Sequence, residues 1–144
     1  MEKNKIQIVE IEVKRARGLR ISGQQNVYAG TSNMRPFFTY DFFTFTHDSA
    51  VVQGSDPSFA DTKQFEVEQT PEFTNYMKNT VFKIDFIDES VEMAAEGSRD
   101  YIGSARVPLQ NLLSAGRFEQ EVEIRDEHTA ITGKCVIRMT IHDA

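Results

Sequence analysis

Apolar positions recur along the chain in short segments, most of them alternating with polar positions, and turn-forming residues separate the segments. A period of two residues predicts β-strands, because successive side chains of a strand point to opposite faces of a sheet. Eight such segments at regular spacing, with very little helix between them, predict an eight-stranded antiparallel β-sandwich. The predicted strands are residues 5–14, 35–45, 49–53, 62–68, 81–88, 101–107, 118–124 and 131–141.

One of these segments, residues 35–45, carries six aromatic side chains among its eleven residues. Its alternation places large apolar side chains on both faces. We therefore interpret the segment as a central strand that is covered on both sides, in preference to a platform for stacking a ligand. A turn at residues 47–48 is expected to lead into the short strand 49–53.

A short helix is predicted for residues 71–79, where it interrupts the run of strands. Thr70 offers a capping hydroxyl, a Pro stands at the first helical position, and Glu72 lies in the first turn. The helical period places three apolar residues on the face that we expect to pack on the core: Phe73, Tyr76 and Met77. A single helical turn is expected at residues 108–113.

The length of 144 residues suits one domain, and we expect residues 1–144 to form it. No apolar run reaches the length of a membrane span, and the first residues lack the apolar core of a signal peptide. The single cysteine, Cys135, excludes an intramolecular disulfide and is typical of a reducing, cytoplasmic environment. It alternates in step with the inward positions of the last strand, so we expect it to be buried.

The net charge of −6 argues against nucleic acid as the main partner, because phosphate binding requires a broad basic face. The positive charge is concentrated near the start, where residues 1–35 carry seven Lys or Arg against three Glu. One interpretation is a patch that contacts anionic lipid headgroups or an acidic peptide, and the other is a set of dispersed charges at a solvated loop. The candidate residues are Lys14, Arg15, Arg17, Arg20 and Arg35.

No recognisable catalytic constellation is present. No His stands near Cys135 or a Ser in a known motif, and the chain has neither a glycine-rich phosphate loop nor metal-ligand spacing. The sequence therefore favours a non-catalytic binding domain without a cofactor.

Several motifs resemble those of C2 domains, which are eight-stranded sandwiches whose loops often bind calcium and phospholipid. The first strand ends in Ala-Arg-Gly-Leu at residues 16–19, similar to the Ala-x-x-Leu of C2 domains. The segment Asp-Tyr-Ile-Gly followed by Val-Pro-Leu, at residues 100–109, is the most specific match. The resemblance covers nearly the whole chain.

A closer resemblance narrows the family. The aromatic strand of residues 37–45, the Val-Val-Gln-Gly of residues 51–54 and the helix with its Lys-Asn-Thr end at residues 78–80 resemble the C2 domains of retinitis pigmentosa GTPase regulator-interacting proteins, which include fantom. These proteins are scaffolds of the ciliary transition zone and the basal body, a cytoskeletal structure. The resemblance implies a protein-binding module at that location, with a nephrocystin-4-like protein as the expected partner.

The resemblance also raises the question of calcium, which needs six to eight oxygen ligands. Residues 18–34, the first expected calcium loop, contain no Asp or Glu. Arg35 occupies the position beside Pro where an Asp is expected, and Ser90 replaces a ligand of the second loop, in which Asp88 and Asp100 remain. We therefore predict a calcium-independent domain without a metal site, and hypothesise that Arg35 forms an ion pair with the two Asp residues.

Two classes of function remain after this reasoning. The first is a protein-interaction module of a ciliary scaffold, acting through a sheet face, a sheet edge or the long loops. The alternative is a membrane-targeting C2 domain that binds anionic phospholipid through the basic loop without calcium.

Overall fold

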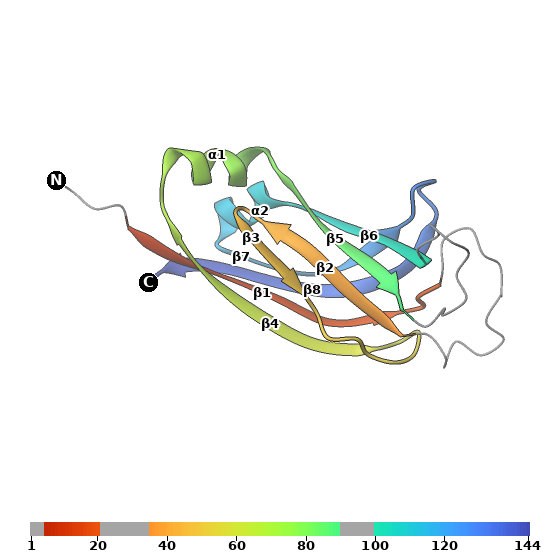
Figure 1. Ribbon diagram of the computed structural model, residues 1–144. Coiled ribbons are helices and arrows are strands. Elements are labelled where there is room, and N and C mark those ends of the chain that lie inside the picture. The colour runs from red at the N-terminus through yellow and green to blue at the C-terminus, as the bar shows by residue number, and fades with distance from the viewer. Residues whose placement is uncertain (1–4, 21–34, 90–99) are drawn as a thin grey trace.

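The computed structural model describes residues 5–20, 35–89 and 100–144 (Figure 1). Within these ranges the chain forms eight strands, the number predicted, and two short helices. In chain order they are β1 (Ile6–Arg17), β2 (Pro36–Phe42), β3 (Phe45–Asp48), β4 (Ser58–Glu68), α1 (Pro71–Asn79), β5 (Val81–Asp88), β6 (Asp100–Pro108), α2 (Leu109–Ala115), β7 (Arg117–Arg125) and β8 (Ile131–Asp143).

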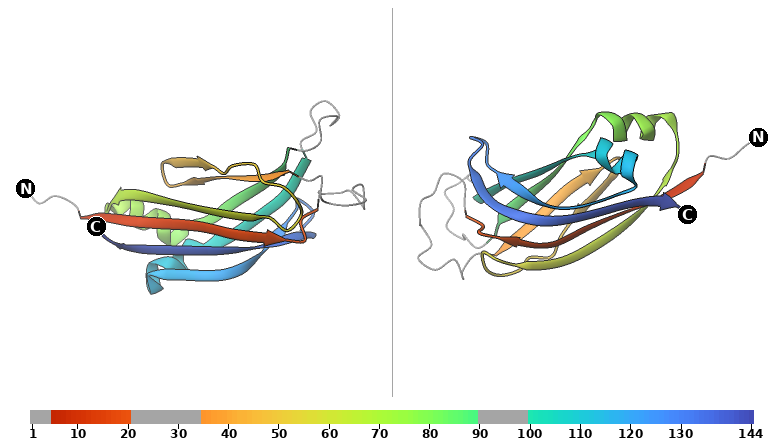
Figure 2. Two further views of the ribbon diagram at one scale, coloured as in Figure 1. Left: turned by 90° about the horizontal axis from the view of Figure 1, so that it is seen from below. Right: turned by 180° about the vertical axis from the view of Figure 1, so that it is seen from behind.

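The strands run in the order β3-β2-β5-β6-β7-β8-β1-β4, and every described pairing is antiparallel. β6 and β7 share only two residue pairs, Ser104 with Arg125 and Ala105 with Ile124. The ladder therefore folds over at this corner into two facing layers, β3-β2-β5-β6 and β7-β8-β1-β4 (Figure 2). The predicted β-sandwich is confirmed.

The core lies between the two layers and is rich in aromatic side chains. Phe38, Tyr40 and Phe42 point inward from β2 and are almost completely buried. The Phe38 ring lies 5.0 Å from the Phe59 ring of β4, so the contact crosses from one layer to the other. Cys135 is fully buried on β8, in agreement with its alternation in the sequence.

The outer face of β2 differs from the prediction. Asp41 is exposed there, and Phe37 and Thr39 are only partly buried. β2 therefore packs against the core with one face and turns a mixed face to solvent, and the expectation of cover on both sides was wrong.

The turn after β2 also differs from the prediction. It falls at Phe43 and Thr44, so β3 starts at Phe45, whereas residues 49–53 form no strand and residues 47–48 form no turn. Phe43 adopts a positive φ of 52°, which bulky residues rarely do. Its ring packs on α1, which stabilises this conformation, with ring centres 5.2 Å from Phe73 and 5.3 Å from Tyr76.

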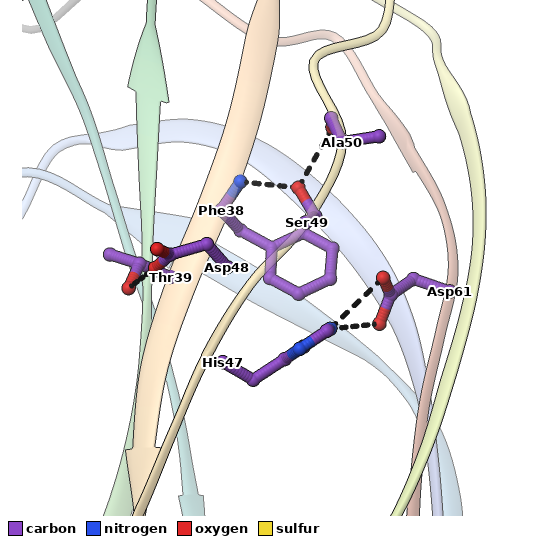
Figure 3. Close-up of polar contacts among 7 residues, drawn as sticks. All are labelled: Phe38, Thr39, His47, Asp48, Ser49, Ala50 and Asp61. Carbon is purple, nitrogen blue, oxygen red and sulfur yellow. Dashed lines mark hydrogen bonds and ion pairs between the residues drawn. The ribbon is translucent and has the colours of Figure 1, made fainter.

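Side chains join the two layers on the side opposite the β6–β7 corner. His47 of β3 points inward, and its Nε2 atom lies 2.8 and 3.0 Å from the two carboxylate oxygens of Asp61 on β4 (Figure 3). Beside this pair the ring of Phe45 lies 4.9 Å from that of Phe65. We call these two contacts the β3–β4 seam.

The two helices lie together at one end of the sandwich (Figure 1). Helix α1 spans the predicted residues, and the Thr70 hydroxyl accepts a hydrogen bond from the Phe73 amide at 3.2 Å. Phe73 and Met77 are buried beneath it, as the helical period indicated. Helix α2 replaces the single turn expected at residues 108–113.

Candidate functional site

Three of the predicted basic residues lie on β1, facing glutamates of β7. Nε and Nη2 of Arg17 each lie 2.8 Å from a carboxylate oxygen of Glu121. Lys14 places its Nζ atom 3.4 Å from Glu119, and Arg15 is exposed on the same strand. The face that the sequence suggested as basic is therefore a mixture of paired charges.

The pairing of Arg17 with Glu121 changes the acid–base behaviour of both groups. The hydrogen bond from Arg17 lowers the pKa of the Glu121 carboxyl, and the charges of Arg17, Lys134 and Arg15 lower it further. The same hydrogen bond raises the pKa of the Arg17 guanidinium. Both groups thus stay charged, and the carboxylate offsets much of the positive potential here.

The other two basic residues lie at strand ends rather than on this face. Nε and Nη2 of Arg20 donate to the carbonyl of Ile131 at 3.2 and 2.8 Å. Arg35 is exposed immediately before β2. The five predicted residues therefore do not gather into one continuous basic surface.

Asp88 ends β5 as a buried carboxylate with an exposed fraction of 3%. Its Oδ1 atom accepts a hydrogen bond from the backbone amide of Arg35 at 2.9 Å, and the amide of Glu89 donates to the carbonyl of Arg35. This carboxylate thus ties the start of β2 to the end of β5. The hypothesis was an ion pair with the guanidinium, but the contact observed here is with the backbone.

The remaining calcium-loop positions are only partly within the described ranges. Asp100 pairs with Asp88 across the β5–β6 ladder, but its side chain lies outside the described part of the chain, as do Ser90 and residues 21–34. Among the residues that the structure describes, no three His, Cys, Asp or Glu side chains gather as a metal site would require.

A hollow of about 400 Å³ opens at the end of β1. The carboxylate of Asp56 lies in its wall and accepts a hydrogen bond from the Gly18 amide at 2.8 Å. Two cations and one carboxylate line this hollow, but Arg17 is also paired with Glu121, so Lys134 is the cation there that could attract an anionic group. The lining residues are Arg17, Gly18, Asp56, Ile131, Gly133 and Lys134.

Sequence reasoning did not anticipate the partners of these cations. Glu119, Glu121 and Glu123 alternate along β7, and all three are exposed on its outer face. The contacts of Glu119 and Glu121 with β1 depend on the register of β7 and β1 against β8, across about one hundred residues of chain. A single sequence carries no direct signal for such long-range register.

Solved structures with the same fold are C2 domains. A C2 domain of plant extended synaptotagmin 1 aligns with a TM-score of 0.64 at 15% identity, over 100% of this chain and 98% of that chain. A C2 domain-containing protein from a putative elicitor-responsive gene aligns with a TM-score of 0.67 at 17% identity, over 100% and 94%. The eight-stranded sandwich is thus that of a C2 domain.

A family model described as the first C2 domain of RPGR-interacting protein 1 matches residues 3–143. The chain therefore belongs to this C2 family, as its aromatic strand and helix insertion suggested. A search of curated proteins gave no match.

The chain also aligns with larger structures. In a structure titled "CC2D1B coordinates ESRCT-III activity during the mitotic reformation of the nuclear envelope" it covers 97% of its own length and 55% of the other chain, with a TM-score of 0.76 and 16% identity. The chain thus spans about half the length of that structure. No helix in the described ranges is both long and apolar enough to cross a membrane.

Proposed function

We propose that this domain is a non-catalytic, calcium-independent protein-interaction module of a scaffold protein at the ciliary transition zone and basal body. The family to which the chain belongs supports a binding role. Calcium independence is supported by the environment of Asp88, a buried carboxylate whose Oδ1 atom already accepts a hydrogen bond from a backbone amide. A nephrocystin-4-like protein is the partner class suggested by the resemblance of the sequence.

Electrostatics support a protein partner over a membrane. Attraction to an anionic bilayer contributes about 1 kcal/mol for each basic residue near the surface, and neighbouring carboxylates offset it. Glu121 and Glu119 lie beside Arg17 and Lys14. This pairing favours recognition of a partner with mixed charge over adhesion to a uniformly negative surface.

Membrane binding remains the second candidate function, and the hollow beside Arg17 and Lys134 favours it. An anionic headgroup in this hollow would meet Lys134 and also Arg17, whose charge Glu121 partly offsets. Arg15 and Arg20, both exposed and close in sequence, would add to the attraction.

The test is flotation of the pure domain with phosphatidylserine-containing vesicles, with and without calcium, at near-physiological salt. We expect no flotation in either condition. Flotation without calcium that is lost at high salt and in the Arg15→Glu, Arg17→Glu, Arg20→Glu variant would establish membrane targeting instead. Arg106→Glu, a change of one exposed arginine on β6, is the matched control.

Calorimetric titration with calcium tests the other half of the proposal. We expect no binding in the submillimolar range and no calcium-dependent change in melting temperature. Asp88→Asn should lower the melting temperature equally with and without calcium, because the carboxylate holds the backbone of Arg35. Submillimolar binding that Asp88→Asn abolishes would contradict calcium independence.

A further inference from the structure

Strand β7 has an edge that the sandwich leaves largely unpaired. β7 pairs with β8 from Arg117 to Arg125, but with β6 only at Ile124 and Arg125. In the described part of the chain, no backbone hydrogen bond reaches residues 117–123 from the β6 side. Figure 2 shows β7 diverging from β6 beyond the corner.

The register shows which backbone groups face this edge. The Ile141 amide donates to the Gly116 carbonyl at 2.9 Å, which places residue 116 in a hydrogen-bonded position opposite β8. Such positions alternate along an antiparallel ladder. The amides and carbonyls of residues 119, 121 and 123 therefore point away from β8, toward the open edge.

The side chains of β7 also alternate. Phe118 and Val122 face the core but are only partly buried, so apolar surface remains beside the edge. Glu119, Glu121 and Glu123 lie on the outer face and are exposed. A hollow of about 370 Å³ lies at the start of the edge, lined by Arg117, Phe118, Glu119 and Arg138.

The two outermost strands of the ladder, β3 and β4, are less suited to pairing. β3 offers only the four residues Phe45–Asp48. β4 is longer, but Lys63 stands at an inward register position opposite Ile11 and is exposed. An inward-pointing charge of this kind discourages a further strand, and β7 carries none between Phe118 and Val122.

Charge determines which strand fits the β7 edge. On the outer face, the column of three glutamates on β7 stands beside a basic column on β8, formed by Lys134 and Arg138. The strand beyond β7 would continue this alternation if its outward residues were basic. A second copy of β7 would bring Glu opposite Glu, which is destabilising.

We propose that the β7 edge between Arg117 and Glu123 binds an extended segment of another protein as an added strand, in which basic residues alternate with apolar ones. The backbone groups of residues 119, 121 and 123 hydrogen-bond to this strand. Its basic residues lie beside the glutamates, and its apolar residues cover Phe118 and Val122. The proposal rests on the interaction-module function and specifies the surface and the partner class.

The test uses a short peptide that alternates Lys with Val, and a control peptide with Glu in place of Lys. We expect the Lys peptide to slow amide exchange at residues 119, 121 and 123, measured by NMR, and to bind about tenfold or more tightly than the control. Equal binding of both peptides, or protection elsewhere on the domain, would overturn the proposal.

Two substitutions at one position separate charge from backbone pairing. Glu121→Gln removes the carboxylate alone, whereas Glu121→Pro also removes the edge-facing amide and spares the hydrogen bonds to β8. We expect Glu121→Pro to bind the Lys peptide about tenfold more weakly than Glu121→Gln. Equal affinities would exclude strand addition.

A modified peptide tests strand addition with the unchanged domain, so the result does not depend on whether a domain variant folds. N-methylation of alternate residues blocks the peptide amides on one edge, and it should abolish binding to the unchanged domain in one of the two alternating patterns. Binding that survives both patterns would contradict strand addition. If the Lys peptide does not bind at the β7 edge and the domain does not float with vesicles, the edge is refuted as the binding site. The interaction-module function is not contradicted by that result.

Discussion

Phe38 shows how one residue links the layers of the sandwich. Its ring lies within 5.0–6.3 Å of the rings of Tyr40, His47, Phe59 and Phe86, and its side chain is fully buried. The neighbouring Phe37 points the other way and is only partly buried. Phe37 and Phe38 are therefore expected to contribute very different amounts to the free energy of unfolding.

We expect Phe38→Ala to lower the free energy of unfolding by about 3–5 kcal/mol, because it removes buried surface and leaves a cavity. Urea unfolding followed by circular dichroism measures this change. Phe37→Ala on the opposite face is the matched control and should cost clearly less. Equal losses for the two variants would contradict the assignment of the faces.

The buried thiol of Cys135 makes the stability of the folded domain depend on pH in the alkaline range. Burial raises the pKa of its thiol, and the charge of Glu121 adds to the shift. An unfolded cysteine ionises near pH ~8.5, so above this pH the unfolded chain loses a proton that the folded chain keeps. The stabilisation is complete below pH ~8.5 and declines as the pH rises.

We therefore expect the free energy of unfolding to fall by about 1.4 kcal/mol per pH unit between pH ~9 and ~10 through this thiol. Cys135→Ala should remove that slope, although its stability at neutral pH is lower. Urea titrations across this range provide the measurement. An unchanged slope in the variant would show that the thiol is not responsible.

At the scale of elements, the pattern of apolar positions identified most strands and the helix insertion. Helix α1 carries local start signals, so its bounds were predictable. The turn between β2 and β3 has no local turn signal in the sequence. Its positive φ falls on Phe43, which gains its support from Phe73 and Tyr76 on a distant helix. Tertiary packing determines the position of this turn. The alternation of apolar and polar residues alone therefore predicted a strand that is longer than β2.

The cap of α1 gives a prediction for one element. Thr70→Ala removes the acceptor of the Phe73 amide and should destabilise the domain by about 1 kcal/mol. Thr70→Ser keeps the hydroxyl and should cost only a small part of this. Thermal unfolding of both variants is the measurement, and equal losses would argue against a capping role.

The candidate site was less predictable than the fold. The sequence indicated that the first calcium loop lacks acids and that Asp88 stands at the end of a strand. It did not indicate that the backbone of Arg35 would use that carboxylate. The neutralisation of Arg17 by Glu121 likewise depends on three strands lying in register. Such contacts follow from pairing geometry rather than from local pattern.

At the scale of the whole molecule, the sandwich closes differently on its two sides. Backbone pairing of β6 with β7 closes one side, and the side chains of the β3–β4 seam close the other. The seam includes the contact of His47 with Asp61, whose side chains are 19% and 17% exposed. The β6–β7 corner is only two residue pairs long, but its backbone groups are hydrogen-bonded, whereas the seam depends on a few side chains of which His47 and Asp61 are partly exposed. This difference favours local opening at the seam.

We expect Asp61→Asn to accelerate amide hydrogen exchange in β3 and β4 while leaving the β6–β7 corner unchanged. Hydrogen exchange with mass spectrometry resolves the two regions. Lys63→Gln, an exposed change two residues along β4, is the control and should alter neither. Faster exchange at both sides would mean that the sandwich opens as one unit.

The antiparallel pairing of β1 with β8 determines how the domain responds to mechanical load. Gln7 pairs with Asp143, and the Ala144 amide donates to the Ile6 carbonyl, so the first and last described strands meet at one end (Figure 1). A force that separates these two strand ends loads the hydrogen bonds one after another, rather than all at once. We therefore expect the domain to yield to such tension by unzipping β1 from β8, at a lower force than simultaneous shearing of the same hydrogen bonds would require.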